Sequence, residues 1–205
     1  MQLEIHDGNT SKIQTPTLQF LPALKGDYLK VSSKNIGRPF HIYIRLSEGY
    51  DTNSQEQTVY PAVYLLDGDS LFPILAASHL FLGYDDFIPE AIIVGIAYDS
   101  FDPGINKRSY DFSMPAADNT PTRGGADTFL NFLEQELIPS VENRYFAAPN
   151  QRVLFGQSQG GHFVPYTAYT RPNLFRGLIA SNPTLLPQKD FFSKNAKAPS
   201  EIKLL

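Results

Sequence analysis

The stretch that decides the fold covers ten residues and reads Val153-Leu154-Phe155-Gly156-Gln157-Ser158-Gln159-Gly160-Gly161-His162. It joins a short apolar run, typical of a buried strand, to the pattern G-x-S-x-G and a candidate helix. In a nucleophile elbow the serine occupies a strained turn, and small neighbours such as Gly156 and Gly160 let the backbone approach closely. The pentapeptide also occurs by chance in Gly-containing turns, but this context predicts an elbow with Ser158 at its apex.

Other apolar runs predict the sheet around this elbow. Residues 62–66, 91–96 and 178–180 are continuously apolar and predict buried parallel strands, with intervals long enough for crossover helices. Alternation over residues 40–46 puts Phe40, Ile42, Ile44 and Leu46 on one face and predicts a half-buried strand. Residues 28–32 should pair with it through a turn at 34–39, and the polar run 51–58 is expected to be a loop.

Two helices are predicted in the second half of the chain. Apolar residues spaced by four predict a helix over residues 126–145, with a kink or break near 135–138 because Pro139 removes a backbone donor. A second helix should begin at Gln159 and end near Thr170, since the following Arg171-Pro172 disfavours helix.

These elements predict an α/β fold: an α/β-hydrolase-type, mostly parallel sheet with an N-terminal antiparallel hairpin and helices on both faces. The chain has 205 residues, 42% of them apolar, which suits one core. We expect a single domain over residues 1–205, in which residues 1–26 form a polar leader.

Composition narrows the range of partners. The net charge is −4, with Lys and Arg scattered along the chain, which disfavours nucleic acid and anionic membranes as partners. The chain has no cysteine, and its four histidines show no metal-ligand spacing, so no cofactor or metal is expected. No long apolar stretch predicts a membrane span, and the first twelve residues have neither the basic nor the apolar region of a signal peptide, so localisation stays undetermined.

Backbone amides suited to an oxyanion lie at two places. The helix after Ser158 directs its N-terminal N–H groups toward the serine, which makes the amide of Gln159 a candidate donor. A second donor is expected after an earlier strand, where Asp67-Gly68-Asp69 ends an apolar run, and the amide of Asp69 is the candidate. The alternative is an ordinary strand-ending turn. An acidic side chain at 69 would oppose an oxyanion unless it points away.

Five segments of the chain form a distributed pattern. They are Tyr60-Pro61-Ala62-Val63-Tyr64-Leu65-Leu66-Asp67-Gly68, Arg108-Ser109-Tyr110-Asp111-Phe112-Ser113-Met114-Pro115, Gly124-Gly125-Ala126-Asp127, Glu136-Leu137-Ile138-Pro139 and residues 156–161. Through these segments the chain resembles the esterase family of α/β-hydrolases, which includes siderophore and feruloyl esterases, S-formylglutathione hydrolase and the mycolyltransferases. The segments occur in family order over roughly residues 28–185.

The resemblance implies roles for particular residues. Ser158 is the nucleophile, and the amides of Asp69 and Gln159 form the oxyanion hole. The segment with Arg108 and Asp111 resembles the family's loop after the third buried strand, near the mouth of the site. We expect these two side chains to form an internal ion pair that orders the loop.

The acid and base of a serine triad are harder to place. In this fold they follow the serine in the order acid, then histidine, yet only Asp190, Glu201 and His162 follow Ser158. His162 lies one helical turn beyond Ser158 and is expected to line the pocket rather than to act as base, and Asp190 is expected to be a solvated loop charge. The resemblance implies further strands in full-length relatives, so we expect a C-terminal truncation. It would expose residues 178–180 as a sheet edge that favours self-association.

Three functions remain open on the sequence. The first is a serine esterase that cleaves a small-molecule ester through an acyl-enzyme on Ser158, inactive if these residues lack a base. The second is a non-catalytic pseudo-hydrolase or fragment that acts by binding. The third is an acyltransferase that uses the same serine. Tyr98, Phe101, Tyr110 and Phe112 indicate an aromatic or apolar substrate group, although core packing explains them equally well.

Overall fold

The computed structural model describes residues 25–50, 58–84, 87–102, 104–114 and 123–183. In these ranges one sheet has the strand order β1-β2-β4-β3-β5-β6. Its strands are β1 (Gly26–Ser32), β2 (Pro39–Arg45), β3 (Tyr60–Leu65), β4 (Ile92–Ala97), β5 (Ala147–Gln157) and β6 (Gly177–Ser181). β2 is antiparallel to β1 and β4, and the pairings β4–β3, β3–β5 and β5–β6 are parallel. The predicted hairpin and mostly parallel sheet are therefore confirmed.

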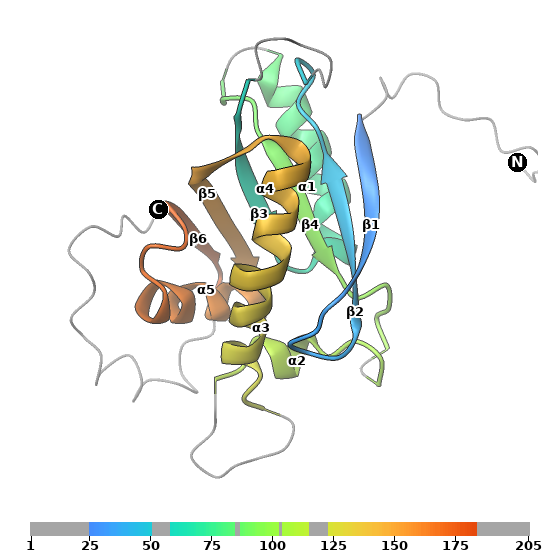
Figure 1. The fold of residues 1–205 in the computed structure, drawn as a ribbon, viewed down its shortest axis with the longest axis vertical. Helices are drawn as coiled ribbons and strands as arrows, with labels where there is room; N and C mark the ends of the chain where they lie inside the picture. The colour runs from blue at the N-terminus through green and yellow to red at the C-terminus, as the bar shows by residue number, and fades with distance from the viewer. Residues whose placement is uncertain (1–24, 51–57, 85–86, 103, 115–122, 184–205) are drawn as a thin grey trace, which may run out of the picture.

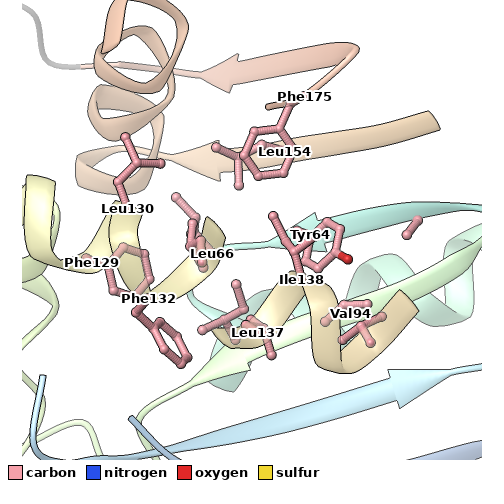
Figure 2. Close-up of a cluster of buried hydrophobic side chains, with 14 of the residues drawn as sticks. Tyr64, Leu66, Val94, Phe129, Leu130, Phe132, Leu137, Ile138, Leu154 and Phe175 are labelled. Carbon is pink, nitrogen blue, oxygen red and sulfur yellow. The ribbon is translucent and has the colours of Figure 1, made fainter. Parts of the chain in front are cut away.

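Helices cover both faces of this sheet, as predicted (Figure 1). The helical segments are α1 (Gly68–Gly83), α2 (Arg108–Asp111), α3 (Ala126–Phe132), the π-helical segment η1 (Leu133–Leu137), α4 (Ile138–Tyr145) and α5 (Gln159–Thr170). One apolar cluster joins the sheet to α3, η1, α4 and α5, and a second joins the opposite face to α1. Figure 2 shows the first cluster, with Phe129, Phe132, Leu137 and Ile138 beside Tyr64, Val94 and Leu154.

One expectation for the hairpin is wrong. The pattern of residues 40–46 predicted a half-buried strand, but β2 is also buried on its polar side, where Tyr28 contacts His41 and α1 contacts Tyr43 and Arg45. His41 is 8% exposed, and its Nδ1 lies 2.5 Å from the hydroxyl of Tyr28. Arg45 is 4% exposed and lies 2.7 Å from Nδ1 of His79 on α1. Burial and the charge of Arg45 lower the pKa of His79.

The predicted kink or break near residues 135–138 is present as a break in the α-helix at η1, which ends two residues before Pro139. Proline lacks the N–H that would bond back to the preceding turn, and a wider π turn accommodates this loss. The same turn presents Glu136 to the turn between β1 and β2. Glu136 accepts hydrogen bonds from the hydroxyl of Ser33 at 2.9 Å and from the amides of Lys34 and Asn35 at 2.8 and 3.0 Å.

Glu136 gives a pH-dependent prediction. Burial raises the pKa of its carboxyl, but the three donors outweigh burial and hold this pKa below its ordinary value of 4.5. The carboxylate therefore stabilises the fold above pH 4.5, and this contribution is lost as the pH falls through the lowered pKa. Glu136→Gln should reduce the free energy of unfolding by about 1 kcal/mol at neutral pH, with the difference vanishing in acid.

Urea unfolding at a series of pH values measures this effect. A matched control is Glu134→Gln, which removes a half-exposed ion pair with Arg171 and should cost no more than about 0.5 kcal/mol. Equal losses in the two variants, or a Glu136→Gln loss that persists in acid, would contradict the account.

Several expectations fall outside the described residues. They include the leader up to residue 24, the loop at 51–57 and Asp190. The single-domain organisation stays a prediction. β6 is the last strand of the sheet within the described part of the chain, and pairing of its outer edge with another chain also stays a prediction. Among the described residues, no helical segment combines the length and the apolar character that a membrane span needs.

Candidate active site

The candidate site is built on the turn between β5 and α5. Ser158 stands there as the N-cap of α5, with φ 54° and ψ −113°, and its side chain is exposed. A residue with a Cβ adopts positive φ only where the surrounding structure enforces it. Here the amide of Ser158 donates to the carbonyl of Ser181 on β6 at 3.0 Å, and its carbonyl accepts from the amide of His162 at 3.0 Å. The strained serine at a strand-to-helix turn has the conformation predicted for an elbow.

Close backbone contacts explain the glycines around Ser158. A Cβ on Gly156 would lie 2.3 Å from the carbonyl oxygen of Gly160, so no side chain fits there. Gly160 is less restricted, since its Cβ would lie 3.2 Å from Oδ2 of Asp67. Sequence reasoning missed Gly161, whose Cβ would lie 2.6 Å from the carbonyl of Ser181. The consecutive pair Gly160-Gly161 was the available signal for this second close contact.

The end of β3 lies beside the elbow because β3 and β5 are parallel neighbours. Asp67 lies two residues after this strand in a left-handed conformation, with φ 57° and ψ 44°, and α1 begins at the next residue. The carboxylate of Asp69 accepts the amides of Tyr98 and Asp99 at 2.7 and 2.9 Å, so its charge is directed toward the end of β4. The amide of Asp69 lies in the first turn of α1, where N–H groups have no acceptor within the helix. Its role as an oxyanion donor stays a prediction.

The expected ion pair between Arg108 and Asp111 is not formed. Arg108 binds Asp67 through two hydrogen bonds, from Nε to Oδ1 at 2.5 Å and from Nη2 to Oδ2 at 2.7 Å. Its Nη1 donates to Oε1 of Gln159 at 2.7 Å, and the hydroxyl of Ser109 donates to the same oxygen at 3.0 Å. The bonds to Asp67 raise the pKa of Arg108, which keeps it charged. Arg108 therefore joins the end of β3 to the residue after Ser158.

Asp111 pairs elsewhere. Its carboxylate accepts hydrogen bonds from Arg38, in the turn between β1 and β2, and from the hydroxyl of Tyr98 at 2.7 Å. The Asp111 side chain is only 2% exposed. Arg108 and Asp111 lie on one short helical turn, but their partners come from different neighbouring elements. The proposed internal pair fails because both charges are used to attach α2 to the sheet.

His162 is buried, at 7% exposure, whereas Ser158 one turn earlier on α5 is exposed. This burial fits a structural or pocket position better than that of a base working at the exposed serine. Asp190 and Glu201 lie outside the described residues. Within the described ranges no group of three or more His, Asp or Glu side chains could hold a metal ion.

The strand order and the strained serine between β5 and α5 define an α/β-hydrolase-type domain. A family model described as "Putative esterase" matches residues 33–201. The chain belongs to this family.

Two curated relatives are siderophore esterases. Ferri-bacillibactin esterase BesA of Bacillus subtilis is 33% identical over 178 residues, which cover 80% of this chain and 60% of the relative. Siderophore triacetylfusarinine C esterase of Aspergillus fumigatus is 30% identical over 201 residues, which cover 92% of this chain and 65% of the relative. The chain thus spans less than two thirds of the length of either relative.

Solved structures share the fold. An IroE-like serine hydrolase from Shewanella oneidensis superposes with a TM-score of 0.72 at 28% identity, covering 84% of this chain and 55% of that one. The BES protein from Bacillus cereus superposes with a TM-score of 0.73 at 24% identity, covering 97% of this chain and 71% of that one. The latter likeness supports the fold alone.

Proposed function

We propose that this protein hydrolyses carboxylic esters through an acyl-enzyme on Ser158. The observation that carries the proposal is the conformation of Ser158, which is strained, exposed and placed at the N-terminus of α5. A strained backbone conformation lowers the stability of the fold. In proteins, residues with such conformations are concentrated at functional sites. Membership of the esterase family supports the same chemistry.

The proposed reaction is the one that a serine nucleophile performs on an ester. The hydroxyl of Ser158 attacks the ester carbonyl carbon and gives its proton to a general base, and the carbonyl oxygen becomes an oxyanion. The amides of Gln159 and Asp69, with the positive end of the α5 dipole, would stabilise this charge. The alcohol leaves with a proton, and water then releases the acid from Ser158. We do not assign the base to His162, because its side chain is buried.

Asp67 and Arg108 would support this site by holding Gln159 in place. Preorganised donors stabilise a transition state only where they are fixed at the correct position. Gln159 supplies one of the proposed amides, and its side chain is held by Arg108 and Ser109. Arg108 is itself fixed by both oxygens of Asp67.

We propose a siderophore-type ester as the substrate, because the curated relatives are siderophore esterases. The four aromatic residues that suggested an aromatic substrate now separate into two pairs. Tyr98 and Phe112 are buried in the core, at 6% and 2% exposure. Phe101, between β4 and α2, is 77% exposed, and Tyr110, on α2, is 40% exposed. Only the second pair is available to contact a substrate.

Product analysis tests the proposed function. The protein is incubated with ferri-bacillibactin or enterobactin, with a simple aryl ester, and with the matching aryl amide, and products are identified by mass. We expect ester cleavage with the gain of one water per bond, and little amide cleavage. Transfer of the acyl group to an added alcohol instead of water would support the acyltransferase alternative. Binding of a siderophore without any turnover would support the non-catalytic one.

Asp67→Asn should lower kcat by about 10- to 100-fold, because a loosened Arg108 misplaces Gln159 and small displacements at a reacting centre are costly. The change should leave KM within a few-fold, since Asp67 is proposed to touch no substrate. A matched control is Glu142→Gln, which breaks a similar two-bond pair with Arg152 between α4 and β5. Steady-state kinetics on both variants measure this, and an equal fall in kcat for the two would contradict the role of Asp67.

A further inference from the structure

The helix α2 is too short to hold its own position. It has four residues, and one helical turn is unstable alone because nucleation costs more than its few hydrogen bonds return. Tertiary contacts must therefore place it. This matters for the site because α2 begins at Arg108, whose guanidinium reaches Asp67 and Gln159.

The other end of α2 is attached by Asp111. This side chain is almost fully buried and accepts from two donors on different elements, Arg38 and the hydroxyl of Tyr98. Arg38 is also fixed, since its guanidinium lies 4.7 Å from the ring centre of Phe40 and 5.5 Å from that of Tyr98. Asp111 thus fastens α2 to the β1–β2 turn and to the end of β4.

We propose that Asp111 is a positioning residue for the esterase site, acting through α2 to set the place of Arg108 and hence of Gln159. The inference rests on the proposed function for its effect on catalysis. Without the carboxylate charge, Arg38 and Tyr98 lose their shared ionic acceptor, and α2 loses its attachment at one end. Arg108 then keeps Asp67 as a partner but is held from one side only.

The chain contains a matched control. Asp27 also accepts from an arginine and a tyrosine, at 3.1 Å from Arg144 and 2.6 Å from the hydroxyl of Tyr145. It lies at the other end of the sheet, because Asp27 pairs with Ile44 near the end of β2, and the next residue, Arg45, pairs with Ile93 near the start of β4. Asp27→Asn therefore removes a carboxylate that accepts from the same two side-chain types, in a more exposed cluster far from the elbow.

The test compares Asp111→Asn with Asp27→Asn in three measurements. They are the rate of labelling of Ser158 by a fluorophosphonate, the NMR signals of the Arg108 Nε–H and of the Gln159 backbone amide, and the urea unfolding midpoint. Asp111→Asn should slow labelling about tenfold and shift both signals, since misplacement near a reacting centre is costly. Asp27→Asn should leave labelling and both signals unchanged. Asp111→Glu, which keeps the charge, should recover part of the labelling rate.

The possible outcomes distinguish failure of the positioning role of Asp111 from failure of the proposed esterase function. If Asp111→Asn lowers only the unfolding midpoint, as Asp27→Asn does, the positioning role is overturned. If Asp111→Asn shifts the Arg108 and Gln159 signals but the parent protein is never labelled, the proposed function fails and the positioning role stands. If Asp111→Asn does not fold, Tyr98→Phe replaces it; this variant removes one hydrogen bond to Asp111 and should shift the same signals by less. Unchanged signals in that variant would overturn the role.

Discussion

Ester hydrolysis by a Ser158→Ala variant should be slower than that of the parent protein by about 10³-fold or more, because the variant lacks the attacking oxygen. Water would then have to attack the ester directly, helped only by the oxyanion donors and by substrate binding. Initial rates with an aryl ester measure the loss. Folding should be unaffected or slightly improved, since alanine removes an exposed hydroxyl that the elbow does not need for its backbone contacts.

The control for this prediction is Ser78→Ala. Ser78 is an exposed serine on α1, and its hydroxyl donates to the carbonyl of Ile74 at 2.8 Å. Its removal should leave the hydrolysis rate within about twofold, as is usual for surface substitutions away from a site. A Ser158→Ala variant that retains most of the parent rate would show that another group carries the reaction.

Gly156→Ala should have the largest effect on stability among single-methyl additions at the elbow. The added carbon would lie 2.3 Å from the carbonyl oxygen and 2.4 Å from the carbonyl carbon of Gly160. Both atoms are backbone, so no side chain can rotate away and the first turn of α5 must move. We expect a loss of about 3 kcal/mol or more in the free energy of unfolding, in the range of severe overpacking. Labelling of Ser158 should fall with it.

Urea unfolding of Gly156→Ala and Gly83→Ala measures this effect. Gly83 ends α1, and a Cβ there would meet no atom within 4 Å. Alanine at position 83 should be neutral or stabilising by up to about 1 kcal/mol, because alanine is the better helix former. Similar stability in the two variants would mean that the close approach of Gly156 and Gly160 is not present in solution.

Much of the fold could be predicted from local patterns. Continuous apolar runs located the parallel strands, and Pro139 located η1, because both depend on residues close together in the chain. The elbow was predicted for the same reason: strand, turn and helix are consecutive. The burial of His41 was not predictable, since its side chain contacts Tyr28 and Asp99, and a strand pattern shows only which residues share a face.

The contacts that organise the candidate site could not be predicted in the same way. Arg108 and Asp67 are 41 residues apart, and Arg38 and Asp111 are 73 apart. Their pairing depends on the sheet order, which places β3 between β4 and β5. Sequence reasoning selected Arg108 and Asp111 but joined them to each other, because proximity in the chain was the only criterion available. The strand order gives each of them a more distant partner.

The central claim is that Ser158 is the reactive nucleophile of this domain. Its most direct test is the intact mass of the folded protein after incubation with a fluorophosphonate, followed by peptide mapping, since this probe reports an activated serine without a chosen substrate. We expect one adduct, on the peptide that contains Ser158, and none on Ser158→Ala. An adduct on another residue, equal labelling of Ser158→Ala, or no labelling of the folded parent protein would contradict this claim.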